Sequence, residues 1–271
     1  PKVPTINATA SIRWTDMNML NFGNNRLSLS FLNARQEVYM SNIQWKKIDM
    51  RGGLRNDIFD VRNVKSTQII GNYDFDQLTN DFISIFYEGR TDTFDDGYFP
   101  RRGVNAGISY AWTFAGFPNT FNNFHTIQAD AKGVLPVGDI FAFIPSFNFR
   151  FLLGADIPVA YFNAIGGSLP SRYVDQQMPF IGITNLSAMK NILTIYRADF
   201  RFRLVKNHYL TGIINYARDC DRFKEYIKGL GYFGAGLEYS FDTIFGPLSA
   251  NIHWSNITKK VGIYLSAGFN Y

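Results

Sequence analysis

The chain has 271 residues, a formal net charge of +5, 17% aromatic and 18% charged residues, and a mean hydropathy of −0.11. No stretch approaches the ~20 consecutive apolar residues that a membrane-spanning helix needs, so a helical membrane protein is excluded. The arginines follow the periodicity of strands rather than forming a surface run, which argues against nucleic-acid binding despite the positive charge.

Alternating hydrophobicity and turn chemistry predict an all-β chain of sixteen strands. Residues 1–7 are predicted to be a linker, and residues 8–271 a single transmembrane antiparallel β-barrel, since no composition break divides them. In chain order, the predicted strands are 9–15, 25–34, 36–46, 50–60, 65–75, 80–88, 103–114, 122–132, 139–153, 157–165, 178–188, 191–205, 207–218, 231–242, 247–256 and 261–271. The patterns of 50–60, 157–165 and 178–188 are weak, which leaves twelve or fourteen strands as alternatives.

Glycine and polar residues mark the predicted reversals between these strands. The reversals include 51–53, 95–97, 132–133 and 154–156. The stretch 166–190 has the longest weak pattern, and we predict a long loop there.

The strand 191–205 shows why the barrel is expected to cross a membrane. Its aromatic and aliphatic side chains alternate with charged ones. The charged members are Arg197, Asp199, Arg201 and Arg203. Successive side chains of a strand point to opposite faces, so one face would contact lipid while the charged face lines a polar lumen. A large soluble β-sandwich alternates as well, and it is the competing fold.

Two further strands support the same interpretation. The strand 139–153 places phenylalanines on one face and Arg150 on the other, with Ile144 as an exception. The last strand, 261–271, alternates throughout and ends on an aromatic residue. Phe269 and Tyr271 resemble the terminal aromatic pair of the signal that barrel-assembly machinery reads, which implies that machinery as a partner.

The last hundred residues resemble the bacterial surface antigen superfamily. The segment 231–248 is similar to that family's glycine-rich strand and the Gly-Pro-Leu turn that follows it. The double glycine Gly166-Gly167, followed by a long segment and then by Asp199-x-Arg201, is similar to the family's order of motifs. The resemblance covers about residues 165–271, and the barrels of this family include outer-membrane assembly insertases and two-partner secretion transporters.

The resemblance implies that the loop near 166–190 folds into the lumen. In the family, such a loop carries Val-Arg-Gly-Tyr/Phe, whose arginine packs against the barrel wall. The nearest equivalent here is Ser171-Arg172-Tyr173, which lacks the glycine. The implied lock would join Arg172 and Tyr173 of the loop to charged residues of the wall, because a buried guanidinium needs a carboxylate partner. The wall residues implied are Asp199, Arg201 and Glu238.

The segment 166–182 looks closest to the barrel that follows patatin-like phospholipase domains. This resemblance implies that the chain anchors, and helps to export, an N-terminal lipase domain that lies outside this sequence. The chain itself contains no Gly-x-Ser-x-Gly nucleophile elbow and no evident pairing of serine with histidine. We therefore expect no catalytic residue, no metal site and no cofactor.

The sequence leaves three functions open for an outer-membrane barrel of a Gram-negative bacterium. The first is the passenger anchor, the second is a passive porin, and the third is an insertase or translocase. The expected partners are outer-membrane lipids, the barrel-assembly machinery, and the chain's own passenger domain or associated outer-membrane subunits.

Overall fold

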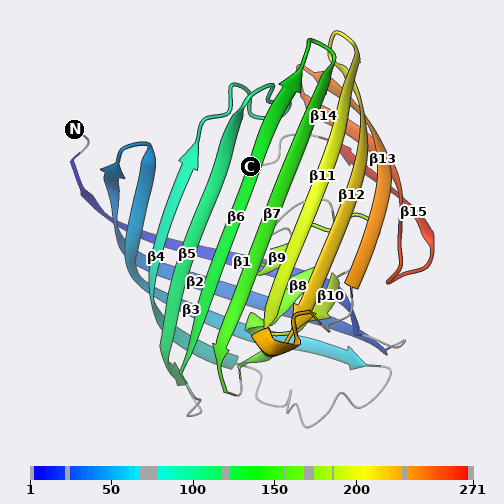
Figure 1. Ribbon diagram of the computed structural model, residues 1–271. Helices are drawn as coiled ribbons and strands as arrows, with labels where there is room; N and C mark the ends of the chain where they lie inside the picture. Colours follow the sequence, from blue (N-terminus) through cyan, green and yellow to red (C-terminus); the bar gives the residue numbers. More distant parts are fainter. Residues whose placement is uncertain are drawn as a thin grey trace.

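The computed structural model describes residues 3–21, 25–66, 79–117, 123–155, 157–167, 174–184, 186–227 and 231–267. Within these ranges, twelve strands of at least seven residues form one wall (Figure 1). They are β1 (Thr5–Asn21), β2 (Asn25–Trp45), β3 (Ile48–Ser66), β4 (Thr79–Asp92), β5 (Gly103–Phe117), β6 (Phe124–Val137), β7 (Phe141–Gly154), β11 (Ile192–Val205), β12 (His208–Cys220), β13 (Gly231–Thr243), β14 (Gly246–Ser255) and β15 (Val261–Ala267). The shorter elements are η1 (Val159–Tyr161), β8 (Asn163–Ile165), β9 (Gln177–Met178), β10 (Leu186–Met189) and η2 (Phe223–Glu225).

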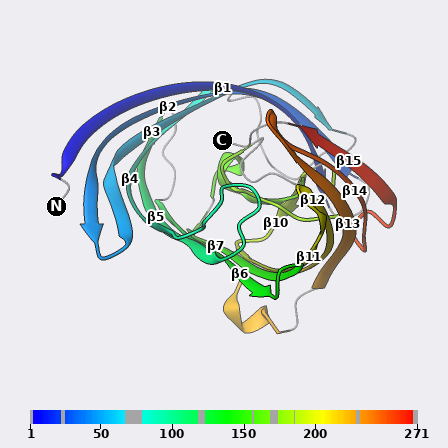
Figure 2. The same cartoon turned by 90° about the horizontal axis from the view of Figure 1, so that it is seen from above.

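Each wall strand pairs antiparallel with its neighbour, and β7 pairs directly with β11. The wall curls into a ring around an interior, and β10 lies inside that ring (Figure 2). At one end of the sheet order lies β15. At the other end, β1 forms a parallel pair with β10 through Met19–Leu186 and Leu20–Ser187. The segment between β7 and β11 is thus joined to the wall by hydrogen bonds but lies within the barrel.

In the described ranges, the number of wall strands corresponds to the lowest of the predicted alternatives; the predicted strand 65–75 lies for the most part outside these ranges. The predicted strands 25–34 and 36–46 form one continuous strand, β2, which pairs with β3 without a break at residues 34–36; its register shifts lie at 30–31 and 40–43. The predicted strands 157–165 and 178–188 are not wall strands; they contain the short elements inside the ring. The first strand begins at Thr5, within the predicted linker, and the division of the chain into linker and barrel stays a prediction.

Two predicted reversals were wrong. Gly52-Gly53 lies inside β3 and Lys132-Gly133 inside β6. At Gly53 a Cβ atom would approach the Val38 carbonyl oxygen to 2.1 Å, so this glycine allows close packing between strands rather than a turn. The chain reverses at Lys46 and Gly138, which have positive φ values of 56° and 65°.

The alternation of apolar and polar faces is confirmed. Large apolar side chains cover the outside, as in β15, where Val261, Ile263 and Leu265 are exposed. Charged side chains face inward, where Arg150 and Asp199 are buried. This is the arrangement of a barrel with lipid outside and polar groups inside. No helix in the described ranges is long and apolar enough to cross a membrane.

The two ends of the barrel differ. At the end where β1 begins (upper in Figure 1), the connections include four short turns, 46–47, 138–140, 206–207 and 244–245, and one longer connection, 93–102, and we call it the turn end. At the other end, the loop end, longer stretches of the chain separate β3 from β4, β7 from β11 and β12 from β13.

Candidate functional site: a closed lumen

The segment between β7 and β11 fills much of the barrel interior, and we call its described residues, 157–167, 174–184 and 186–191, the plug. Its apolar side chains are almost wholly buried. One cluster packs plug residues against β2, β3 and β4, and a second packs them against β11, β12 and β13. Phe180 and Ile165, for example, have no exposed surface. Because burying such a side chain contributes about 1.5–3 kcal/mol, the plug is part of the folded core rather than a loose loop.

The double glycine forms a turn within the plug. Gly166 and Gly167 have φ values of 138° and 71°, which lie in the region that favours glycine. The Gly167 N–H donates to the Ile183 carbonyl at 2.7 Å, and the Gln177 side-chain amide donates to the Gly166 carbonyl at 2.7 Å. The turn therefore holds two strands of the plug together.

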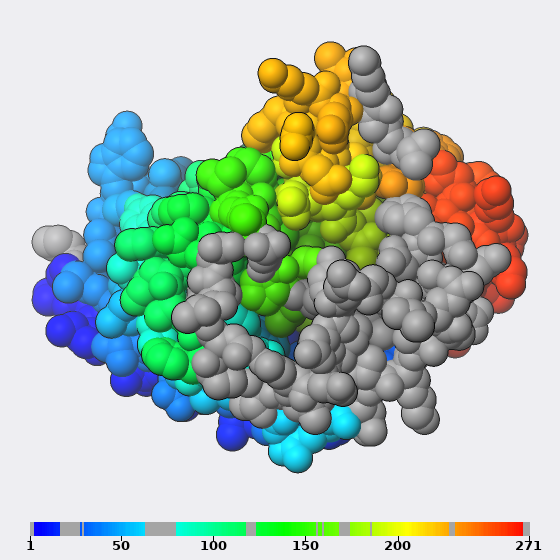
Figure 3. Space-filling model, turned by 90° about the horizontal axis from the view of Figure 1, so that it is seen from below, coloured from blue at the N-terminus to red at the C-terminus, as the bar shows by residue number. Residues whose placement is uncertain are grey.

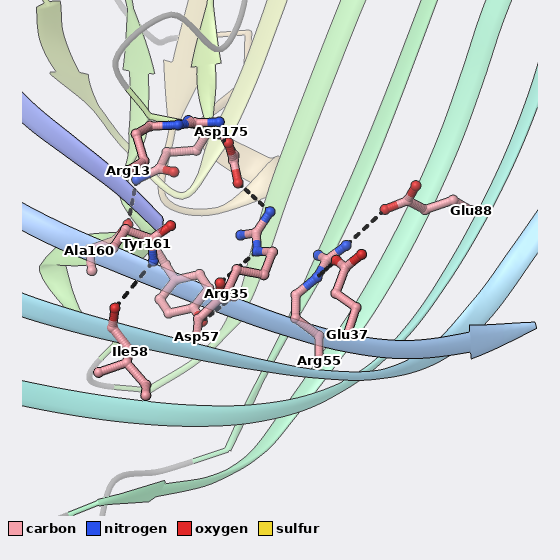
Figure 4. A network of polar contacts seen from close by, with 12 residues as sticks. Arg13, Arg35, Glu37, Arg55, Asp57, Ile58, Glu88, Ala160, Tyr161 and Asp175 are labelled. Carbon is pink, nitrogen blue, oxygen red and sulfur yellow. Dashed lines mark hydrogen bonds and ion pairs between the residues drawn. The ribbon is translucent and has the colours of Figure 1, made fainter. Parts of the chain in front are cut away.

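A carboxylate of the plug is bound by two arginines of the wall (Figure 4). Asp175 accepts from Arg13 of β1 at 3.0 Å and forms an ion pair with Arg35 of β2. Arg35 also pairs with the buried Asp57 of β3 at 2.6 Å, and the Tyr161 hydroxyl of the plug donates to the same carboxylate at 3.3 Å. Burial alone would raise the pKa of Asp175, but Arg35 and Arg13 lower it below its ordinary value of 3.8.

The ion pairs continue along the lumen face of β2, β3 and β4. Arg55 bonds to Glu37 at 2.6 Å and to Glu88 at 3.0 Å, and Arg51 bonds to Glu88 at 2.7 Å. Arg51, Arg55 and Glu88 help to line a polar chamber of about 320 Å³ beside the plug. Because the cations and carboxylates of this face pair with each other, the cost of placing charges inside the barrel is offset, and their side chains narrow the lumen.

The plug is also bound on the opposite side of the barrel. The Gly182 carbonyl accepts from Ser255 at 2.8 Å and from Thr258 at 3.1 Å. A Cβ atom at Gly234 of β13 would lie 2.1 Å from the Ile181 carbonyl oxygen. The glycine-rich strand β13 thus lets the backbone of the plug touch the wall. Since the ion pairs lie on β1 and β2, the plug connects the first strands of the sheet to the last.

A second segment, residues 93–102, covers part of the turn end, and we call it the lid (Figure 2). Arg201 of β11 donates to the Pro100 carbonyl, and Phe99 stacks on Tyr209 of β12 with ring centroids 4.2 Å apart. Phe94 packs against a buried cluster that includes Ile144. In the described part of the chain, the lumen thus contains the plug and is partly covered by the lid at the turn end. The predicted reversal at 95–97 lies in this lid, where Asp95 and Asp96 accept backbone N–H groups.

The sequence-predicted site residues have several different positions. Asp199 pairs with Arg197 at 2.6 Å, Glu238 accepts from Ser240 and Asn251, and Arg201 binds the lid. Arg172, Tyr173, Phe269 and Tyr271 lie outside the described residues, so the lock and the assembly signal stay predictions.

The ionic contact through Asp175 was not foreseen, because the sequence argument sought an arginine on the loop. One of its wall partners, Arg13, does alternate with outward-facing apolar neighbours, Ile12 and Trp14. The sequence analysis did not single out Arg13 or Arg35, and strand alternation carries no information about their partner in the plug. Within the described ranges, no group of three or more histidine, cysteine, aspartate or glutamate side chains could hold a metal ion.

Comparisons with known proteins fit this geometry. Residues 5–271 match the family model of the OMP85 superfamily. The fold is similar to the crystal structure of BamA from Haemophilus ducreyi lacking POTRA domains 1–3, with a TM-score of 0.65 and 13% sequence identity. That alignment covers 96% of this chain and 57% of the BamA chain. A comparison with curated proteins gave no match. Because the family match extends over nearly the whole chain, this protein belongs to the OMP85 superfamily and is a β-barrel of the Gram-negative outer membrane.

Proposed function

We propose that this barrel is a closed scaffold that anchors an N-terminal patatin-like domain in the outer membrane and takes part in its export. The observation that carries the first half of the proposal is the doubly bound plug. Asp175 ties it to β1 and β2, and Gly182 ties it to β14. A barrel whose interior is packed in this way is poorly suited to passive diffusion, which disfavours the porin alternative.

The second half of the proposal, that the barrel anchors a patatin-like domain, rests on the resemblance of residues 166–182 to the barrels that follow such domains. The direction of β1 is compatible with it. Outer-membrane barrels have short periplasmic turns and longer extracellular loops, so the turn end is the periplasmic one. Since β1 begins at that end, a domain preceding it would lie in the periplasm, and the chain would pass from that domain into β1.

The test is to isolate the native polypeptide from outer membranes with an antibody against the barrel and to identify its peptides by mass spectrometry. We expect one polypeptide that contains these barrel peptides together with an upstream Gly-x-Ser-x-Gly segment. Hydrolysis of a phospholipid by that polypeptide, abolished by Ser→Ala in the elbow, would support the lipase. An upstream region of periplasmic repeats without the elbow would contradict the proposal and favour an insertase.

A second candidate is a translocase that works through the junction of the first and last strands. One observation favours it: in the described residues, β1 is paired on that side only at Met19 and Leu20, with β10. A cysteine pair at Met19 and Leu186 would lock this contact. If the barrel is a translocase, oxidising the pair should block delivery of its client, whereas an anchor would be unaffected.

A further inference from the structure

The outer wall carries a ladder of aromatic pairs along β7 and β11. Phe141 faces Phe202, Phe143 faces Phe200, and Phe147 faces Tyr196, with ring centroids 4.8, 5.4 and 5.2 Å apart. The ladder has one gap in this run. Between the second and third pairs, Pro145 faces Ala198, and neither side chain fills the space that a ring would occupy.

The gap widens into a groove across neighbouring strands. Small residues on the outward phase of β6, Ala131 and Gly133, extend its floor beside Pro145 and Ala198. Larger side chains form its walls and include Phe147, Tyr196, Ile214 and Tyr216. The groove has a volume of about 530 Å³ and lies on the lipid-facing surface of the barrel. A lipid acyl chain is the group that suits a narrow apolar depression in a lipid-facing wall, because acyl chains are the solvent at that surface.

A folded segment stands at the loop end of the same strands. Residues 221–227, which we call the flap, follow β12 and turn outward, away from the lumen (Figures 1 and 2). The Tyr226 hydroxyl lies 2.7 Å from the Thr194 hydroxyl of β11, and Phe223 packs edge-on against Phe151 of β7 at 5.0 Å. Because Thr194 is two residues from Tyr196, the flap stands roughly 7 Å from Tyr196 of the groove, toward the loop end.

The exposed surface of the flap suits the boundary between lipid headgroups and acyl chains. Phe223 is 58% exposed and Ile227 is 82% exposed, although both lie beside a lipid-facing wall. Arg222 and Lys224 are exposed next to them, as are the carboxylates Asp221 and Glu225. Seen from the loop end, the orange segment that contains the flap projects beyond the ring (Figure 3). Interfacial membrane anchors typically combine apolar side chains, which enter the membrane, with neighbouring cations, which bind lipid phosphates.

We propose that the groove and the flap together form a binding site for one phosphorylated acyl lipid of the outer leaflet. An acyl chain lies in the groove between Tyr196 and Tyr216, over the small residues Pro145 and Ala198. The phosphate lies at the flap, within reach of Arg222 and Lys224. The loop end is the extracellular end, so the flap is placed at the headgroup level of the outer leaflet.

The continuity of the groove with the flap favours a lipid, rather than a second copy of the chain, as the occupant. The apolar groove and the flap with Arg222 and Lys224 follow one another along a single pair of strands, as the tail and the phosphate of one lipid do. Flat packing of two barrels would instead use the aromatic ladder and would have no use for the small residues at its gap.

The test fills the gap in the ladder. Ala198→Phe would place a ring opposite Pro145, where the neighbouring pairs already have rings. Ala250→Phe is the matched control, because Ala250 also faces outward, on β14, away from the groove. Each protein is refolded into nanodiscs that contain equimolar phosphatidylglycerol and phosphatidylcholine. Native mass spectrometry then counts the lipids retained after release, and the heat-modifiable shift on gels reports folding.

We expect the unaltered protein and Ala250→Phe to retain one phosphatidylglycerol, and Ala198→Phe to retain about tenfold less. Arg222→Glu combined with Lys224→Glu changes only exposed flap residues and leaves the wall intact, so it tests the site even if Ala198→Phe does not fold. This pair should abolish the preference for phosphatidylglycerol while retention of phosphatidylcholine persists.

Three results would overturn the proposal. The first is equal lipid retention by folded Ala198→Phe and Ala250→Phe. The second is an unchanged lipid preference in the charge-reversed protein. The third is a loss of dimers, rather than of lipid, in Ala198→Phe, which would assign the groove to a second copy of the chain.

Discussion

Replacing Asp175 by asparagine tests how firmly the plug is held in the lumen. The substitution keeps the size of the side chain and removes the negative charge that binds Arg13 and Arg35. The packed clusters and the contact at Gly182 would remain. We therefore expect the plug to leave its position more often without the barrel unfolding.

The exposure of the three side chains sets the size of the effect. The Asp175 side chain is 36% exposed, and those of Arg13 and Arg35 are 46% and 23% exposed. Exposed ion pairs contribute about 0–1 kcal/mol, and a hydrogen bond to a charged group about 1.5–3 kcal/mol. Arg35 keeps its bond to Asp57 at 2.6 Å, so no cation is left buried without a partner. We expect a net loss of about 1–2 kcal/mol, which is a factor of about 5–30 in the equilibrium.

The assay is single-channel recording in planar bilayers, in which each excursion of the plug appears as a transient opening. Asp130→Asn is the matched control, because Asp130 pairs with Arg90 of the wall at 3.1 Å and does not hold the plug. We expect Asp175→Asn to open about 5–30 times more often than the unaltered protein, and Asp130→Asn to open as rarely. Equal opening frequencies for the two variants would refute the argument that Asp175 holds the plug.

Three further predictions concern the same closed lumen. The pKa of Asp175 is lowered in the folded barrel, so its stabilisation of the plug is present at neutral pH and is lost as pH falls through that lowered value. Channel openings should therefore increase only below about pH 3.8, and Asp175→Asn should lack this increase. Gly234→Ala, whose added Cβ would meet the plug backbone at 2.1 Å, should cost about 1–3 kcal/mol and lower the thermal midpoint of the gel shift. Gly212→Ala, with open space around its Cβ, should not; equal midpoints would contradict the contact. Arg201→Ala should release the lid, with faster proteolysis between residues 93 and 102 as the readout and unchanged rates as the contrary result.

The orientation of side chains on the strands could be predicted because it depends only on local chain geometry. A strand alternates its faces with a period of two, wherever it lies in the fold. The exception at Ile144 has a tertiary cause. This residue faces inward on β7, where Val134 of β6 and Phe94 of the lid form an apolar cluster near the turn end. Neither contact can be recognised from the alternation of β7 alone.

The glycines show where local reasoning was insufficient. Glycine marks turns, but it also lets two backbones approach closely, and only the fold distinguishes the two uses. Gly52-Gly53 and Gly133 were assigned to turns and lie inside strands. Gly166 and Gly167, in contrast, do have the positive φ values of a turn.

The charged residues of the lumen were predicted as a class but not as pairs. The alternation of side chains along their strands predicted that Arg150 and Asp199 face the inside of the barrel, and both are buried there. Which cation meets which carboxylate depends on strand register and on the path of the plug. The contact of Asp175 with Arg13 joins residues 162 positions apart in sequence, and the strand alternation of β1 says nothing about it.

The most direct test of the closed lumen is the conductance of the refolded barrel in planar bilayers, compared with a variant that lacks residues 169–177. The deletion removes Asp175 and part of the plug while leaving every wall strand in place. The account predicts that the intact barrel is closed apart from rare transient openings, and that the deletion variant conducts ions steadily. A large, steady conductance in the intact barrel would contradict the closed lumen and would favour a porin.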